Sequence, residues 1–438
     1  MLSLPLAEDV SLSDLEQLIA FLRSQGTFHF PVLPNGLFPA AGADAAQTTN
    51  YHYVWVRDNV HIAHAHDVLG ERTIAAANAR ALAKYFGTQR SKMRAIIDGK
   101  VSPENVMKRP HIRFRQDMTE ITEKWSHAQN DALGYFLWHF SRMASGGHFT
   151  PDADEMETLI DLVRYLGAIR YWQDADSGHW EEVRKVSASS IGCAVAGLEA
   201  LTRWLESPAA VGLKIPASLP GEIAELIRQG RGALARILPH ECIEADPQRQ
   251  RRCDGALLFL IYPMKVVDDA MADAILADVA AMLAGEHGIR RYLGDSYWCA
   301  DYKAALGAEE RTADFSDDLE RRDRLAQPGL EAQWCIFDPV VSVVYGERYQ
   351  RLGRAEDFRR QLHHLNRSLG HLTTPETRPT LPGFRGPESY YSERGTYVPN
   401  DILPLLWTER IWRSRWRRCG RACKAAPSSP PQTECADV

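Results

Sequence analysis

A series of ten segments with helical periodicity constrains the fold of this chain more than any other feature. Apolar residues recur three and four positions apart in each segment, while the alternating Val/Ile-rich runs that mark strands are scarce. Ser13 followed by Glu16 predicts an N-cap and capping box for the first segment, 12–25. The other segments cover 59–86, 128–144, 156–171, 188–205, 221–237, 268–284, 332–352, 355–369 and 402–413. Many helices without strands predict an all-α bundle or helical toroid.

Composition narrows the class of protein. The 438 residues are 45% hydrophobic and 25% charged, as in ordinary globular proteins, and a net charge of −6 provides no basic field for nucleic acid. The N-terminus lacks the basic and apolar regions of a signal peptide, and no segment could span a membrane, so we expect a cytoplasmic protein. Cys193 and Cys335 lie in apolar helical patterns and are predicted to be buried thiols, whereas Cys419 and Cys423 make at most a weak metal pair.

The connections between the helices are rich in Trp, Tyr, Arg, Asp and Glu, which predicts a scaffold that presents a site from its loops. Asp131 in one of them is predicted to be a helix N-cap or a supporting group. His61 and His64 share a helix face, but no acidic ligand accompanies them, so we interpret them as ordinary helix residues. Neither GxGxxG nor GxxxxGK[ST] occurs, which disfavours a nucleotide enzyme.

The stretch HWEEV, residues 179–183, places two glutamates behind a tryptophan. Neighbouring residues cannot point at the same spot, so Glu181 and Glu182 cannot form one carboxylate pair. They could simply begin a helix, where the dipole favours Glu. Alternatively, Trp180 provides an apolar wall beside Glu181 and raises its pKa, and the second carboxyl comes from the predicted loop PESYYSER, as Glu388 or Glu393. One protonated and one ionised carboxyl is what glycoside hydrolysis requires.

The stretch VWVRDN fits the same chemistry. Arg57 and Asp58 put donors and acceptors for sugar hydroxyls side by side, and aromatic rings nearby could hold the apolar faces of a sugar. The alternative for Arg57 and Asp58 is a buried salt bridge between helix and loop. For Trp55, Trp125 and Trp180 the alternative is core packing.

Six motifs occur in one order: YHYVWVRDN, KWSHAQND, GHWEEVRKVSASSIG, RRYLGD, EAQW and PESYY…YVPND…PLLW. In this order they resemble the glucoamylase-like glycoside hydrolases of family 15, especially the branch related to the N-terminal part of phosphorylase kinase alpha subunits. The resemblance covers roughly residues 50–407. It implies an (α/α)6 barrel with the site at its loop end, a fold that agrees with the helix count.

The resemblance also implies a role for each motif residue. Glu181 matches the general acid, Glu388 the general base that activates water, and Glu182 a contact on the leaving-group side. Glu393 remains a rival to Glu388, because SER resembles the base-bearing stretch of fungal members. The residues that match the sugar pocket are Tyr51, Trp55, Arg57, Asp58, Trp125, Trp180 and Arg291.

The implied activity is an inverting, exo-acting α-glucosidase that removes glucose from the non-reducing ends of gluco-oligosaccharides or glycogen. No metal or organic cofactor is expected, and the partner is the α-glucan rather than nucleic acid or membrane. The rival interpretation is a non-catalytic glucan-binding or regulatory module of the phosphorylase kinase alpha type. We predict a lead-in helix over 1–30, the catalytic domain over 31–412 and a basic, Pro/Ser-rich disordered tail over 413–438. Linkage preference and oligomeric state stay open.

Overall fold

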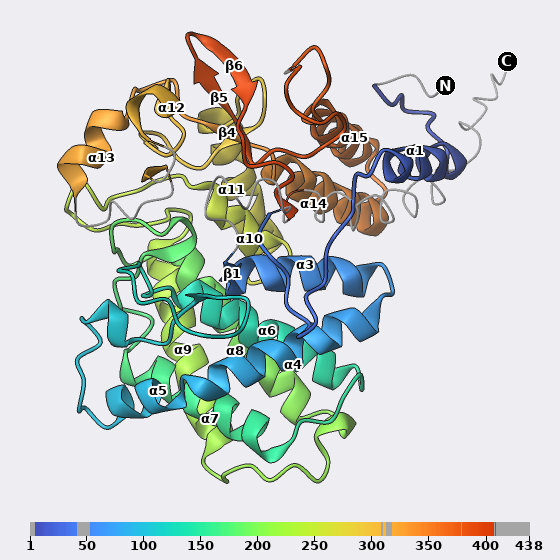
Figure 1. Ribbon diagram of the computed structural model, residues 1–438. Helices are drawn as coiled ribbons and strands as arrows, with labels where there is room; N and C mark the ends of the chain where they lie inside the picture. Colours follow the sequence, from blue (N-terminus) through green and yellow to red (C-terminus); the bar gives the residue numbers. More distant parts are fainter. Residues whose placement is uncertain are drawn as a thin grey trace, which may run out of the picture.

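The computed structural model describes residues 5–41, 53–307, 310–311, 318–377, 379–406 and 408, without the side chain of residue 319. Fourteen α-helices dominate this part of the chain, and its strands are few and short (Figure 1). The fold is the predicted (α/α)6 barrel, in which an inner helix is followed by an outer helix that packs against it.

Five inner–outer pairs lie wholly within the described residues. Their inner helices are α3 (Val56–Val68), α6 (Asn130–Ser145), α8 (Ala188–Leu205), α10 (Leu258–Ile261) and α14 (Phe337–Leu352). The outer helices that follow them are α4 (Arg72–Thr88), α7 (Ala153–Ala168), α9 (Leu219–Ile237), α11 (Asp269–Met282) and α15 (Ala355–Gly370). Along the inner ring, α3 packs on α6, α6 on α8, α8 on α10 and α10 on α14.

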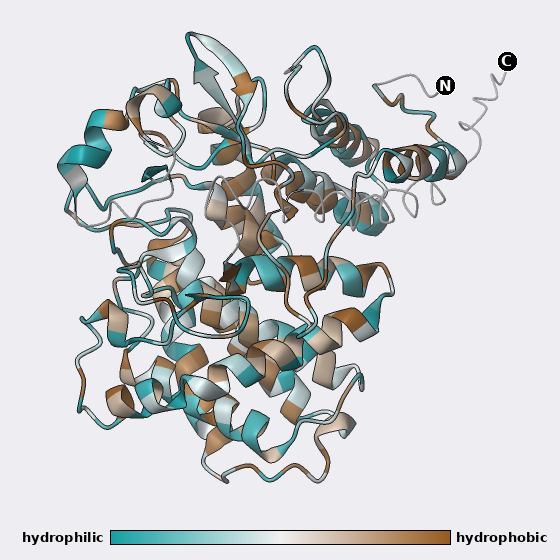
Figure 2. Ribbon diagram, viewed as in Figure 1, coloured by the Kyte–Doolittle hydropathy of each residue, from teal (hydrophilic) through white to brown (hydrophobic). Residues whose placement is uncertain are grey.

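Sequence decides which helices lie inside. The inner helix α8 reads ASSIGCAVAGLEALTRWL and is buried on almost every side, whereas α15 buries mainly one stripe that includes Leu362, Leu365 and Leu369. Small residues let α6 and α8 approach closely: a Cβ on Gly134 would lie 2.3 Å from the carbonyl of Cys193. In Figure 2 the outlying helix α13 (Leu319–Leu325) is almost wholly hydrophilic, which fits a position away from the core.

Short elements complete the described chain. Helix α1 (Leu12–Ser24) follows a segment that is tied to α15, because the backbone of Leu6 exchanges hydrogen bonds of 2.7 and 2.9 Å with the side chain of Asn366. Helices α5 (Arg90–Ile97) and α12 (Tyr302–Ala305) belong to connections. Strands β1 (Val54–Trp55) and β2 (Arg113–Phe114) form an antiparallel pair.

A second sheet gathers four strands from distant parts of the chain. Its order is β3 (Ile289–Arg290), β4 (Gln333–Trp334), β5 (Ser389–Glu393) and β6 (Thr396–Pro399), and all its pairs are antiparallel. The sequence predicted a loop for PESYYSER, and that prediction was wrong, because most of this stretch is strand β5 of a hairpin.

The helix predictions are confirmed to within a few residues, with three corrections. The segment predicted as helix over 332–352 begins instead with strand β4, and its helix α14 starts only at Phe337. The segment predicted as one helix over 59–86 is divided at Gly70, whose φ of 85° ends α3 before α4 begins. The N-cap of α1 is Ser11 rather than Ser13, and Asp14 completes the capping box. Half of the residues of 402–413 lie outside the described residues, as does the tail with Cys419 and Cys423, and the domain boundaries remain predictions.

Two further expectations concern cysteines and membranes. Cys193 and Cys335 are free and buried, as predicted. Among the described residues, no helix has the length and apolarity needed to cross a membrane.

Candidate active site

Arg57 lies at the start of α3, directly after β1, and its guanidinium is buried. Its Nη1 donates to Oδ2 of Asp131 at 2.6 Å and to Oε1 of Gln129 at 3.1 Å, while its Nη2 lies 3.5 Å from Oε1 of Glu181. A buried salt bridge is therefore present, but it joins α3 to the first turn of α6 rather than a helix to a loop. The same guanidinium also faces the predicted general acid, so the salt bridge does not exclude the predicted sugar-pocket role of Arg57.

Asp58, the next residue, is buried in the first turn of α3. Burial raises the pKa of Asp58 to about 7; the Arg57 cation opposes the rise and the charge of Glu181 adds to it. A carboxyl that is close to half protonated at neutral pH can both donate and accept hydrogen bonds, which suits recognition of hydroxyl groups.

Glu181 does not begin a helix. It follows the 3₁₀ turn Gly178–Trp180 with a φ of 58° and a ψ of 42°, in the left-handed region that residues other than glycine rarely occupy. The indole Nε1 of Trp180 donates to Oδ1 of Asp254 at 2.8 Å, which fixes the turn from outside. The Glu181 side chain is 17% exposed and reaches Arg57. Backbone strain at a candidate catalytic residue is a recognised association.

Glu182 has a different environment from its neighbour. Its Oε1 accepts from Lys185 at 3.0 Å and from Arg251, and its Oε2 accepts from the Tyr292 hydroxyl. Burial by itself would raise the pKa of Glu182, but the cations of Arg251 and Lys185 hold it well below its usual range. Glu182 is therefore an ionised, clamped carboxylate that is unsuited to donate a proton, which leaves Glu181 as the candidate proton donor.

Glu388 stands immediately before β5 and is 2% exposed. Its Oε2 accepts from Nδ2 of Asn400 at 2.9 Å and from the hydroxyl of Tyr297 at 3.4 Å. Glu393, the rival, ends the same strand at the hairpin and accepts from the hydroxyl of Tyr391 at 2.5 Å. The two glutamates therefore have different surroundings: Glu388 contacts Tyr297 and Asn400, whereas Glu393 contacts its strand neighbour Tyr391.

Arg291 connects the two halves of the site. Its guanidinium forms a fork on Asp295, with both N···O distances 2.6 Å. Around it lie the rings of Trp180, Tyr297 and Trp334, whose centroids are 5.1, 4.9 and 4.9 Å from its central carbon. Trp180 belongs to HWEEV and Tyr297 touches Glu388, so this aromatic box joins the two candidate catalytic stretches.

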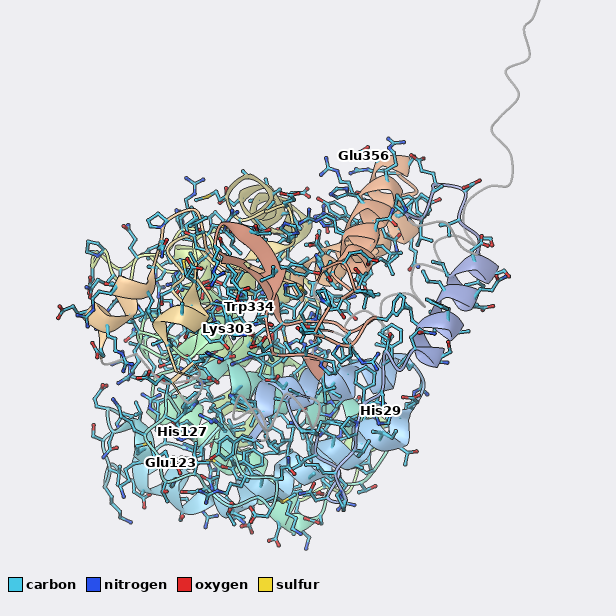
Figure 3. The ribbon with its side chains drawn as sticks, turned by 45° about the horizontal axis from the view of Figure 1, so that its top comes forward. His29, Glu123, His127, Lys303, Trp334 and Glu356 are labelled. Atoms are coloured by element: carbon cyan, nitrogen blue, oxygen red, sulfur yellow. The ribbon has the colours of Figure 1, made fainter. Side chains whose placement is uncertain are left out.

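The two halves of the candidate site come from parts of the chain that are distant in sequence. Figure 3 labels Trp334, from β4, well apart from His127, from the loop before α6. The α3 half contributes Trp55, Arg57, Asp58 and Trp125 and meets Glu181, while the sheet half contributes Arg291 and Glu388.

Trp55 and Trp125 belong to a separate aromatic cluster rather than to the main core. Both rings, with that of Tyr53, surround the guanidinium of Arg113, whose central carbon lies 4.8, 3.8 and 4.4 Å from their centroids. Packing and a substrate role are compatible here, because a cation fixes the orientation of both rings. Tyr51 lies outside the described residues.

The histidines of α3 have structural partners. His64 lies 3.0 Å from the Tyr262 hydroxyl and packs on Trp138, and His61 packs between Tyr135 and Phe259. Within the described part of the chain, no group of three or more His, Cys, Asp or Glu is placed to hold a metal ion.

Several residues of the site escaped the sequence analysis. Asp131 was predicted only as a helix N-cap or a supporting group; the N-cap of α6 is Gln129, and Asp131 supports the site by binding Arg57. Tyr297 and Asn400 lie in or beside motifs that carried a signal, namely RRYLGD and YVPND. Arg113 and Arg251 lie in no motif, and only tertiary contacts reveal them.

Three comparisons bear on the family. The sequence model described as "Glycosyl hydrolases family 15" matches residues 28–230. The curated "Probable phosphorylase b kinase regulatory subunit alpha" of Caenorhabditis elegans is 25% identical over 394 residues, which are 82% of this chain. The chain spans only about 30% of that relative's length.

Solved structures share the fold. A glycosidase, solved as wild type and as a variant in complex with glucose, superposes with a TM-score of 0.66 at 18% identity, covering 93% of this chain and 98% of its own. The glucoamylase of Saccharomycopsis fibuligera superposes with a TM-score of 0.61 at 14% identity, covering 95% and 97%. The resemblance of this chain to glycoside hydrolase family 15, with a relative among phosphorylase kinase alpha subunits, is thereby confirmed.

Proposed function

We propose that this chain is an inverting, exo-acting α-glucosidase that releases glucose from the non-reducing ends of gluco-oligosaccharides or glycogen. Glu181 is the general acid and Glu388 the general base. One observation carries the proposal: the two glutamates come from different halves of the site, yet the rings of Trp180, Trp334 and Tyr297 pack in series between them. The guanidinium of Arg291 lies against these rings.

The mechanism follows from that arrangement. Glu181 protonates the leaving glycosidic oxygen while Glu388 draws a proton from water on the opposite face of the sugar. Inversion requires room for this water, so we expect about 6.5–9.5 Å between the carboxyl groups in the working enzyme. Asn400 and Tyr297 donate to Oε2 of Glu388 and orient its carboxylate.

The sugar pocket would be built by residues of the α3 half together with Arg291. Flat apolar surfaces for the sugar come from Trp55, Trp125 and Trp180. Hydrogen-bond partners for its hydroxyl groups come from Arg57 and Asp58. Glu182, held by its cationic neighbours, contacts the sugar on the leaving-group side. The glucose bound in the related glycosidase supports a sugar ligand for this fold. We further propose a cytoplasmic location, which the five free and buried cysteines among the described residues favour.

A second candidate function comes from the curated relative. Because that relative is a regulatory subunit, the chain could bind a glucan without hydrolysing it. Glu181 would then be a sugar ligand rather than an acid. The two functions differ in whether glucose is released.

The test measures glucose release from maltotriose, isomaltose, trehalose and glycogen by the wild type and by Glu181→Gln, with NMR to identify the first anomer. We expect β-glucose from at least one substrate and a loss of about 100-fold or more in the variant. α-Glucose as the first product would overturn inversion. No release together with retained oligosaccharide binding would establish the regulatory function.

A further inference from the structure

We propose that Asp131 is a positioning residue that holds Arg57 back from Glu181 and thereby keeps the candidate proton donor protonated. This inference rests on the proposed function and deepens it. Asp131 never touches the sugar in this proposal; it acts through the guanidinium that it shares with Glu181.

The contacts of Arg57 are unequal. Its Nη1 lies 2.6 Å from Asp131, a strong charge-assisted hydrogen bond, whereas its Nη2 lies 3.5 Å from Glu181, at the limit of a hydrogen bond. Gln129 accepts from the same Nη1 at 3.1 Å. Two acceptors on α6 therefore pull the cation away from Glu181.

The side chain of Asp131 is held in a fixed position beside Arg57. It is fully buried in the first turn of α6, and its Oδ2 also lies 3.7 Å from Nδ1 of His179. His179 stands two residues before Glu181 and stacks on Phe259 with a centroid distance of 5.4 Å. The same carboxylate thus anchors the arginine and borders the turn that carries the acid.

Other charged groups around Glu181 must be considered. Burial lowers the pKa of His179 to about 4, so this imidazole is neutral between pH 5 and 8. Asp58 has a pKa raised to about 7 and titrates in the range where a general acid would. Glu182 and Lys185 neutralise each other at 3.0 Å. Any test must therefore measure the ionisation of Glu181 itself rather than the combined titration of all groups in the site.

Two consequences of replacing Asp131 change the pKa of Glu181 in the same direction. Replacing Asp131 with Asn removes a negative charge near Glu181 and frees Arg57 to approach it. Less repulsion and a closer cation both favour the ionised form of Glu181, so its pKa should fall. The alkaline limb of the pH profile of kcat/KM should then move to lower pH.

The experiment uses protein labelled with ¹³C in the glutamate carboxyl groups, with the Glu181 resonance assigned by its absence from Glu181→Gln. NMR titration should give a pKa for Glu181 about one unit lower in Asp131→Asn than in the wild type. Asp131→Glu keeps the charge and should restore most of the shift. Selective labelling excludes Asp58, and the readout needs no turnover, so it stands even if the proposed hydrolysis fails.

A second variant protects against loss of folding, because Asp131 is completely buried. Gln129→Glu places a second negative charge beside Nη1 of Arg57, the atom that Asp131 binds, and should raise the pKa of Glu181. An unchanged Glu181 pKa in a folded Asp131→Asn, or a shift in the same direction in both variants, would overturn the proposal. A fall in kcat without any movement of the alkaline limb would show a purely structural role.

Discussion

Glu388 and Glu393 stand five residues apart, and at the scale of single residues their surroundings separate them. Glu388 is buried and accepts from Asn400 of the neighbouring segment and from Tyr297. Glu393 lies at the hairpin end of β5 beside Tyr391. If Glu388 is the base, Glu388→Gln should lower glucose release by about 100-fold or more, and its acid limb should vanish from the pH profile. Glu393→Gln, the matched control on the same strand, should retain most of the activity; the reverse result would transfer the role.

The residues alone could nominate these two glutamates, and only the family resemblance favoured Glu388. Both lie in an aromatic stretch bounded by Gly and Pro, and both match a pattern of the family. The choice depends on Tyr297, whose contact with Glu388 joins residues 91 positions apart. In the same way, the pattern WEEV located Glu181 and Glu182 but could not show that Arg251 and Tyr292 clamp only the second of them.

At the scale of elements, the close contact between the inner helices α6 and α8 depends on glycine. A Cβ on Gly134 would meet the backbone of Cys193 at 2.3 Å, and neither helix can yield without moving the ring. Gly134→Ala should therefore reduce the free energy of unfolding by about 3 kcal/mol, the upper end of overpacking costs. Gly232→Ala on the outer helix α9, where the nearest atom is 3.7 Å away on a flexible arginine, should be neutral or slightly stabilising. Equal chemical denaturation curves for the two variants would contradict this account.

Periodicity predicted the long helices because each spans several turns of one repeating pattern. The segment 188–205 agrees with α8 residue for residue. The sheet escaped prediction because β3 and β4 have two residues each, too few for any alternation to appear. The break at Gly70 was missed because the apolar pattern continues on both sides of it. Short elements that build the site are set by tertiary pairing, which a single segment does not encode.

At the scale of the whole molecule, buried carboxyl groups of two kinds set the pH range in which the barrel is stable. In the first kind burial raises the pKa: to about 7 for Asp58 and Asp176 and to about 8 for Glu241. In the second kind cationic neighbours outweigh burial and lower the pKa of Glu182 and Asp338. A carboxyl whose pKa is raised in the folded protein stabilises the fold fully below its pKa in the unfolded chain. This contribution is lost as the pH rises through 7 to 8. A lowered pKa favours the fold above about 4 and loses that contribution as pH falls further.

The two kinds together predict a maximum of stability near pH 4, because the ion-paired carboxylates protonate below it and the buried carboxyls with raised pKa values lose their contribution progressively from there up to pH 7–8. Melting temperature measured from pH 3 to 9 should fall on both sides of that maximum. Asp58→Asn should flatten the alkaline fall, because the amide need not ionise in the interior, whereas Asp98→Asn on the surface should leave the curve unchanged. Glu182→Gln should cost stability mainly above pH 5, where it leaves Arg251 and Lys185 without their shared carboxylate. The melting temperature could instead rise steadily to pH 9 and be the same for Asp58→Asn and the wild type. That result would mean that Asp58 is already ionised in the folded protein. It would remove the basis for a carboxyl that both donates and accepts hydrogen bonds in the pocket.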